Sequence, residues 1–286
     1  MEFLKGYMDN TQYRHALNDL TQEIYSFSFE DWYISGYYEG DYIPYSYMKN
    51  GEIISNASAN IMKMVQNGRE KLYIQIGTVM TRPEYRNRGL AGTLISMIID
   101  DYKSLADGFY LYANLNALGF YERQGFCRLD QWRYSQKITS LENVTEPFEK
   151  AGDRLLARYR YLLHNAAVNH KLDQRNRAAL QLFYTGKMEK VYYHNKLDCF
   201  AVMHADDRIL YLDSVISSVK IPLSDILKHV PMQYDTVVLG FTPEADTEGF
   251  TAQKYDGEDD YRFYYMGNSL EEIAEEKLFF PVMSHT

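Results

Sequence analysis

The spacing of hydrophobic residues in the first third of the chain changes from helical to strand-like. Apolar side chains first recur at three- and four-residue intervals, and β-branched and aromatic residues then dominate three successive runs. The predicted elements are helices over 10–26 and 29–37, followed by strands over 43–49, 53–65 and 72–81. Asn50-Gly51 and Asn67-Gly68 are turn signals between the strands, so we expect an antiparallel meander.

After Pro83 the pattern returns to helical spacing. It predicts a helix over 89–102, a strand over 109–113 and a short helix over 117–123 that ends at Gly125 as its C-cap. The order of strand, glycine-containing loop, helix and strand describes an α/β unit. Such a unit has a ligand-binding loop at the carboxyl end of a strand.

The second half contains another cluster of short elements after a polar connector. We expect helices over 148–170, 174–184, 224–230 and 271–277, and strands over 199–204, 209–214, 237–241 and 261–266. Asp206-Asp207 is the expected turn of a hairpin between the first two of these strands. The pattern predicts two domains, with a first unit at 1–136, a connector at 137–147 and a smaller α+β domain at 148–286.

Composition and charge narrow the possible functions. The 286 residues are 46% hydrophobic and 24% charged, which is ordinary for a globular protein. A net charge of −9 without a basic cluster opposes binding to nucleic acid. The apolar runs are much shorter than the roughly 18 residues of a membrane span, and no export signal is evident, so we expect a cytoplasmic protein.

Cysteine and tyrosine contents add two further expectations. Cys127 and Cys199 are the only cysteines, which excludes a disulfide framework and a cysteine-based metal site; we expect both to be reduced core residues, and no metal is expected. The chain has 27 tyrosines, and such side chains suit half-buried strands and the walls of pockets.

The candidate chemistry begins at the turn that precedes the helix over 89–102. The segment Arg86-Asn87-Arg88-Gly89-Leu90-Ala91 follows a strand and opens this helix. Unpaired backbone N–H groups and the positive end of the helix dipole favour an anion there, and two arginines add positive charge. The glycines are too sparse for a dinucleotide fingerprint, and no P-loop is present.

A second motif follows at the distance expected for one binding site. It comprises Asn114, Ala117, Phe120, Tyr121 and the pair Gly125-Phe126. With Arg86, Gly89 and Ala91 of the first motif, this pattern resembles the GCN5-related N-acetyltransferase (GNAT) superfamily over about residues 1–136, and the whole chain resembles a two-domain bacterial-type member.

The resemblance implies a GNAT fold, with a central mixed, mostly antiparallel sheet flanked by helices, that binds acetyl-CoA between its fourth and fifth strands. The cofactor-binding residues that it implies are Val79, Met80, Thr81, Arg86, Asn87, Arg88, Gly89, Leu90, Ala91, Gly92, Asn114, Asn116 and Ala117. It also implies that a backbone N–H near Val79 binds the thioester oxygen and that Tyr121 is the general acid for the leaving thiolate.

At the position where better-defined relatives carry their general base, this sequence departs from the family pattern. Many of them place a Glu on the fourth strand, whereas residues 73–81 contain Gln75 and no carboxylate. A water relay or a more distant group must then serve. The candidates are Glu30, Asp31, Glu39, Asp41, His15 and, as in some two-domain relatives, a carboxylate at the end of 281–286.

The second half of the chain carries no comparable phosphate loop, so we expect no second cofactor site there. It is either a degenerate transferase half or a lid over the acceptor site. The acidic segment 255–260 suits either a cationic acceptor or a solvated loop.

The function expected from these features is an acetyl-CoA-dependent N-acetyltransferase that acts on a primary amine by direct attack. The alternatives are a non-catalytic acyl-CoA-binding sensor and a structural interaction protein. The acidic composition is compatible with polyamines, aminoglycosides or basic peptides as acceptors, and neither the acceptor nor the oligomeric state follows from the sequence.

Overall fold

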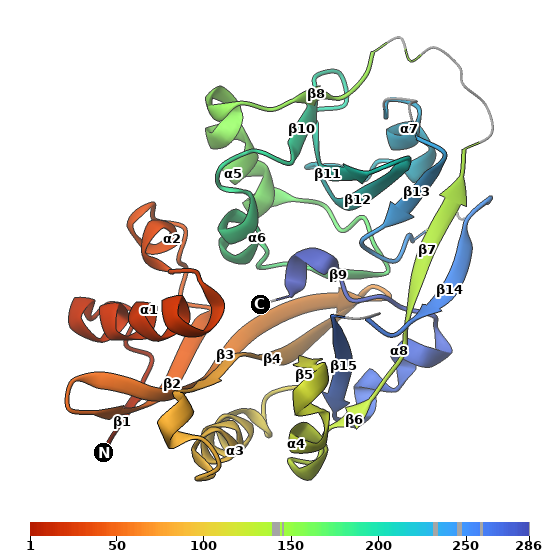
Figure 1. Ribbon diagram of the computed structural model, residues 1–286. Coiled ribbons are helices and arrows are strands. Elements are labelled where there is room, and N and C mark those ends of the chain that lie inside the picture. The colour runs from red at the N-terminus through yellow and green to blue at the C-terminus, as the bar shows by residue number, and fades with distance from the viewer. Residues whose placement is uncertain (139–143, 145, 231–233, 245–247, 258–259, 286) are drawn as a thin grey trace.

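The computed structural model describes residues 1–138, 144, 146–230, 234–244, 248–257 and 260–285. Its described strands form two mixed sheets, and helices and loops cover them (Figure 1). The first sheet carries the predicted cofactor-binding segments. The second lies beside it, above the long curved strands β3 and β4 in the view of Figure 1.

The first sheet has the strand order β1-β2-β3-β4-β5-β15-β6, and β9 pairs with β3. All its pairs are antiparallel except β4 with β5, which is parallel. The strands are β1 (Glu2–Lys5), β2 (Tyr42–Lys49), β3 (Glu52–Gln66), β4 (Arg69–Thr81), β5 (Gly108–Asn114), β6 (Cys127–Arg128), β9 (Leu172–Gln174) and β15 (Tyr261–Met266). The predicted meander is confirmed by the antiparallel pairing of β2, β3 and β4.

Helices cover both faces of the first sheet (Figure 1). Leu94, Ile95 and Ile98 of α3 are buried against Ile74 of β4 and Leu111 of β5, because this helix repeats apolar residues on one side. The helices of this part are α1 (Thr11–Tyr25), α2 (Glu30–Ile34), α3 (Leu90–Tyr102) and α4 (Leu118–Arg123), with short 3-10 turns at Pro83–Tyr85 and Leu115–Ala117. All four helices correspond to predicted elements.

The second sheet has the strand order β14-β7-β13-β12-β11-β10-β8, antiparallel except for the parallel pair β12 and β13. Its strands are β7 (Gln131–Lys137), β8 (Glu149–Lys150), β10 (Val191–His194), β11 (Cys199–Asp206), β12 (Ile209–Ile216), β13 (Thr236–Leu239) and β14 (Thr251–Tyr255). The helices of this half are α5 (Leu156–Asn165), α6 (Ala178–Thr185), α7 (Leu223–Leu227) and α8 (Glu272–Glu275), with 3-10 turns at Asp153–Leu155, Asn268–Leu270 and Val282–Ser284. The expected hairpin is confirmed as β11 and β12.

The two sheets do not follow the predicted division of the chain. β7 lies before the expected connector but pairs with β13 and β14 of the second sheet. Conversely, β15 comes from the second half and lies between β5 and β6 of the first sheet. Most of the connector, at 139–143 and 145, lies outside the described residues. Long-range pairing, which local spacing does not encode, decides which sheet each strand joins.

Three further predictions of local structure were wrong. The helix expected over 148–170 is confined to Leu156–Asn165, and Gln174 of the next expected helix belongs to β9. Leu172 is fully buried where β9 pairs with β3, so its apolar character reflects packing on a sheet. Cys199 is buried as expected, but Cys127 is exposed because β6 is an edge strand.

Candidate functional site

The central feature of the site is a gap between β4 and β5. These parallel strands pair at Tyr73–Gly108, Ile74–Phe109 and Gln75–Tyr110, and the pairing goes no further, although both strands continue. Residues 76–81 of β4 and 111–114 of β5 do not pair with each other and therefore leave an opening between them. This is the separation that the family resemblance led us to expect.

A cleft of about 1200 Å³ includes this opening. All predicted cofactor-binding residues and Tyr121 line it: Val79, Met80, Thr81, Arg86, Asn87, Arg88, Gly89, Leu90, Ala91, Gly92, Asn114, Asn116, Ala117 and Tyr121. The structure thus brings two motifs that are separate in the sequence to one cavity. Their individual roles in binding and catalysis remain predictions.

A bulge in β4 shapes the middle of the cleft. The register between β3 and β4 shifts between the pairs Ser58–Gly77 and Asn56–Met80, so Thr78 and Val79 have no partners in it. Thr78 has a φ of 42°, an uncommon value for a β-branched residue.

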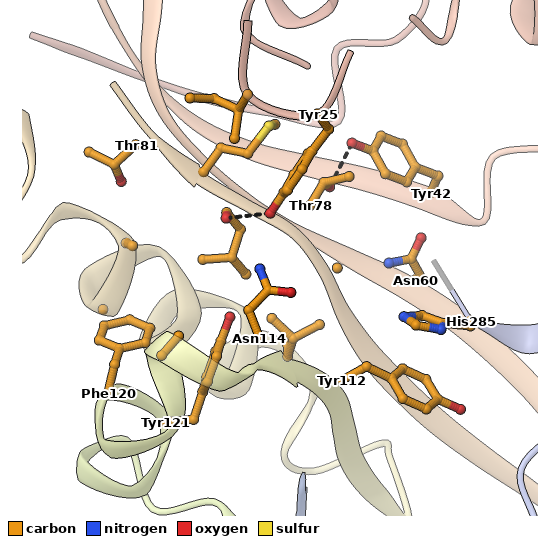
Figure 2. A pocket seen from close by; sticks show the side chains of 18 of the residues that line it. Tyr25, Tyr42, Asn60, Thr78, Thr81, Tyr112, Asn114, Phe120, Tyr121 and His285 are labelled. Atoms are coloured by element: carbon orange, nitrogen blue, oxygen red, sulfur yellow. Dashed lines mark hydrogen bonds between the residues drawn. The ribbon is translucent and has the colours of Figure 1, made fainter. Parts of the chain in front are cut away.

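Side-chain hydrogen bonds hold the bulge in place. The Tyr42 hydroxyl lies 2.9 Å from Thr78 Oγ1, and Asn56 Nδ2 donates to the Thr78 carbonyl at 2.8 Å. The Tyr25 hydroxyl donates to the Val79 carbonyl at 3.1 Å, and Figure 2 shows Tyr25 and Tyr42 beside Thr78. The bulge is thereby fixed by side chains from β2, β3 and α1.

The turn before α3 has the geometry expected of an anion site. Asn87 and Gly89 both have positive φ, at 60° and 77°. Within the described residues, no protein group accepts a hydrogen bond from the N–H groups of 88–92. Arg86 Nε donates to the Thr81 carbonyl at 3.0 Å, and an Arg88 nitrogen donates to the Glu84 carbonyl at 2.6 Å. The free N–H groups and both arginines thus lie on one wall of the cleft.

Tyr121 lies on α4 with a buried ring that packs against Phe120 and Phe126. Gly125 ends this helix with a φ of 90°, and the Phe126 N–H donates to the Tyr121 carbonyl, which confirms the predicted C-cap. In Figure 2 the Tyr121 hydroxyl and the Asn114 side chain both point from the β5 side toward β4. Burial, and secondarily the nearby Tyr25, raises the pKa of Tyr121 well above its ordinary value.

Most base candidates lie away from the cleft. Glu30 pairs with Arg14 at 3.0 Å, and hydrogen bonds from Arg14 lower the pKa of Glu30. His15 lies 3.4 Å from the same carboxylate, and Glu39 lies 3.2 Å from His164. None of Glu30, Asp31, Glu39 and His15 lines the cleft, whereas Asp41 does.

The end of the chain also reaches the cleft. His285 lines it and stacks on Tyr112 at 3.8 Å, and the His285 carbonyl accepts a hydrogen bond from Tyr184. Burial lowers the pKa of His285 to about 4, so this imidazole is neutral at pH 7. The predicted carboxylate belongs to Thr286, which lies outside the described residues.

The acidic segment 255–260 does not contribute to the cleft in its described part. Asp256 instead lies 3.2 Å from Arg128, and residues 258–259 lie outside the described residues. This arrangement gives no support to the segment as an acceptor site.

The sequence patterns missed much of the wall opposite the phosphate turn. This wall is rich in aromatic and amide side chains: Tyr25, Phe27, Phe29, Trp32, Tyr42, Asn60, Gln174, Asn176, Phe183 and Tyr184. The abundance of tyrosine hinted at pocket walls, but no motif marks these positions. The contributions from 174–184 depend on the pairing of β9 with β3 and on the contact of α6 with α2, where Trp32 Nε1 donates to the Ala179 carbonyl.

The fold and the cleft place the protein in the class of GNAT-fold proteins. Residues 9–126 match the model of the acetyltransferase (GNAT) family. This part of the chain is similar to that family, and the match supports an enzyme of the acetyltransferase class.

Solved structures support the same fold over nearly the whole chain. A GCN5-related N-acetyltransferase from Anabaena variabilis matches with a TM-score of 0.58 at 14% identity, over 92% of this chain and 72% of that one. One from Kribbella flavida has a TM-score of 0.57 at 16% identity, over 92% and 70%. Eis1 from Mycobacterium abscessus has a TM-score of 0.53 at 13% identity, over 92% and 72%.

Two further searches gave negative results. No curated protein matches the sequence. Among the described residues, no helix has the length and apolar character needed to span a membrane.

Proposed function

We propose that the protein transfers the acetyl group of acetyl-CoA to a primary amine by direct attack, with Tyr121 as the general acid. The observation that carries this proposal is the convergence of three features on one cleft. These are the gap between β4 and β5, the turn with free N–H groups, and a buried tyrosine whose hydroxyl faces the gap.

The residues of the cleft fit acetyl-CoA, which supplies the acetyl thioester when bound. The N–H groups of 88–92 have no acceptor within the described protein, and diphosphate oxygens are acceptors. Arg86, Arg88 and Arg123 add positive charge to the cleft wall. The unpaired edges of β4 and β5 offer backbone groups to amides of the pantetheine arm.

In the proposed reaction a C–N bond forms, the thioester C–S bond breaks and the departing sulfur takes a proton. The Val79 N–H lies in the bulge and is proposed to donate to the thioester oxygen as negative charge develops there. Tyr121 is proposed to give its phenolic proton to the sulfur. The ordinary pKa values of about 10 for Tyr and 8.5 for a thiol make this transfer uphill by only about 1.5 units.

Burial raises the pKa of Tyr121 and makes the phenol a weaker acid than in water. The same burial disfavours a thiolate, so the proton affinity of the sulfur rises in the same cleft. The two effects oppose each other, and the proton transfer stays feasible.

Deprotonation of the amine is proposed to use water within the cleft. A primary alkyl amine has a pKa near that of lysine, about 10.4, so it must lose a proton before attack at neutral pH. Asp41 is the only carboxylate among the described residues of the cleft wall, and it is not on the β4 bulge. A relay through water therefore fits the wall better than direct contact with a carboxylate.

The test combines cofactor binding with turnover. Calorimetry with coenzyme A measures binding, and thiol release from acetyl-CoA over a panel of amines measures transfer. We expect Tyr121→Phe to lower turnover about 100-fold or more while the affinity for coenzyme A stays nearly unchanged. Tyr161→Phe, at an exposed tyrosine outside the cleft, is the matched control.

The outcomes separate the proposal from its alternatives. Binding of coenzyme A without thiol release on any amine indicates an acyl-CoA sensor, and absence of binding rejects the cofactor site. Full turnover of Tyr121→Phe at saturating amine and several pH values removes Tyr121 as the acid.

A further inference from the structure

The charged side chains of the cleft are divided between two regions. Arg86 and Arg88 belong to the turn before α3 and Arg123 to α4, so positive charge gathers where the cofactor phosphates are proposed to bind. Asp41 is the only acidic residue among the described residues of the wall. The cleft thus offers positive charge to the cofactor and one negative charge elsewhere.

Asp41 is held where both halves of the chain meet. Its carbonyl accepts the Ile61 N–H at 2.9 Å, and the Asn176 side chain favours the ionised form of its carboxylate. The Asn176 amide in turn donates to the Ile61 carbonyl at 2.7 Å and accepts the Lys63 N–H at 2.9 Å. The backbone of Asp41 and the side chain of Asn176, from the segment between β9 and α6, are therefore both held on β3 at Ile61.

This carboxylate is incompletely neutralised. Within the described residues it has no salt bridge, although the more distant charge of Lys63 favours its ionised form. Burial is the largest effect on Asp41 and raises its pKa above the ordinary value. A bound cation would offset this loss of solvation, and charged hydrogen bonds of this kind are the strong ones.

Asp41 is displaced from the proposed reaction centre. It is joined to the backbone of Tyr42, and the Tyr42 hydroxyl at the far end of that side chain contacts Thr78 beside Val79. Figure 2 shows Tyr42 reaching across to Thr78 in this way. The strand register separates the two places: the Asp41 carbonyl bonds Ile61, whose partner on β4 is Ile74, four residues before Thr78. An ammonium on Asp41 therefore lies apart from an amine that attacks beside Val79.

Aromatic side chains cover the wall near Tyr42. Phe29 packs on Tyr42 with ring centroids 4.7 Å apart, and Trp32 and Phe183 extend the same cluster. All four residues line the cleft. Such a wall favours an apolar segment in the ligand and also attracts cations through the ring faces.

We propose that the acceptor is a diamine-type molecule, with a second cationic group joined to the reacting amine by an apolar segment, and that Asp41 binds the second group. This inference rests on the proposed function, since it concerns the acceptor half of the same cleft. Asp41 is in this view a specificity residue, and it does not take the proton of the attacking amine.

The test compares linear α,ω-diamines of three to eight carbons with monoamines of the same length. The readout is kcat/KM for thiol release at saturating acetyl-CoA. In the native protein we expect at least one diamine to exceed its matched monoamine by about tenfold or more, which corresponds to one charged hydrogen bond. Asp41→Asn keeps the side-chain shape and is expected to remove this preference, mainly by raising KM for the diamine.

Two control variants test whether the preference for diamines depends specifically on the charge of Asp41. Glu39→Gln removes a nearby negative charge that does not line the cleft, and it should preserve the preference for diamines. Asp41→Glu retains the charge and should restore part of the preference. Thermal melting of each variant checks that the fold is intact.

The inference is overturned if diamines and monoamines are used equally, if no diamine is acetylated, or if Asp41→Asn retains the preference. Calorimetry with coenzyme A, done on the same preparations, shows separately whether the cofactor site exists. Cofactor binding with thiol release on monoamines alone would reject the diamine acceptor and leave the proposed transferase function standing.

Discussion

Glu30 is a carboxylate for which a structural role and a catalytic role can be separated by experiment. The sequence made it a base candidate, but the structure places it on Arg14, whose side chain is 6% exposed. Arg14 donates to both carboxylate oxygens, at 3.0 and 3.1 Å, and Asn18 donates to one of them at 2.9 Å. We therefore expect Glu30→Gln to lower stability and to leave catalysis unchanged.

The contacts of Arg14 determine how much stability Glu30→Gln is expected to lose. Breaking a buried ion pair from one side costs about 3–5 kcal/mol because the remaining charge is left unpaired. Arg14 keeps a hydrogen bond to the Met8 carbonyl at 2.8 Å and a position 3.8 Å from the Tyr33 ring centre, and the Glu30 side chain is 29% exposed. The lower end, about 3 kcal/mol, is therefore expected, or a fall of roughly 5–10 °C in Tm.

The pH dependence follows from the lowered pKa of Glu30, which Arg14 causes chiefly through hydrogen bonds. A carboxyl group whose pKa is lower in the folded state adds stability above its unfolded value, 4.5, and this stability is lost as pH falls through the folded value. The difference in Tm between the native protein and Glu30→Gln should thus be full at pH 7 and shrink below pH 4.5.

The assay measures Tm by thermal melting from pH 7 to pH 3.5. It also measures kcat at a temperature well below Tm. Asp31→Asn, at an exposed position of the same helix, is the control and should change neither quantity. A Glu30→Gln variant with an unchanged Tm would refute the reasoning from burial. Loss of kcat at full stability would instead restore Glu30 as a base candidate.

Two other changes probe the cofactor turn and the junction of the two halves. Gly89→Ala adds a Cβ at a φ of 77° where no atom lies within 4 Å, so we expect a stability cost of only about 1–2 kcal/mol but at least tenfold weaker binding of coenzyme A by calorimetry. Gly152→Ala, equally open and without positive φ, is its control, and equal affinities would count against the turn as the phosphate site. Asp173→Asn breaks a 2.8 Å pair with Arg177 in which both side chains are at most 5% exposed, so urea unfolding should show a loss of about 3–5 kcal/mol. A change below about 1 kcal/mol would show that the pair is not needed for stability.

Local sequence determined the elements that build the cofactor half of the cleft. The strand over β4, the glycine-containing turn, α3, β5 and the capped helix α4 each follow from spacing and turn residues within a short window. The family pattern then joined the turn at Arg86 to Tyr121, and both line one cavity. Such elements can be predicted from a single sequence because side-chain directions in a helix or strand repeat every few residues. Apolar residues that face the core therefore recur at a regular spacing.

Only the tertiary structure decided the acceptor half and the roles of the charged residues. Glu30 and Asp41 look alike in the sequence, yet one is bound to Arg14 and the other lines the cleft beside Asn176. Phe183 reaches the wall from the second half, and β15 enters the first sheet from almost 150 residues beyond β5. Such contacts depend on burial and pairing between segments that are distant in the sequence. A local pattern of apolar and polar positions does not specify which distant segment a strand or helix will contact.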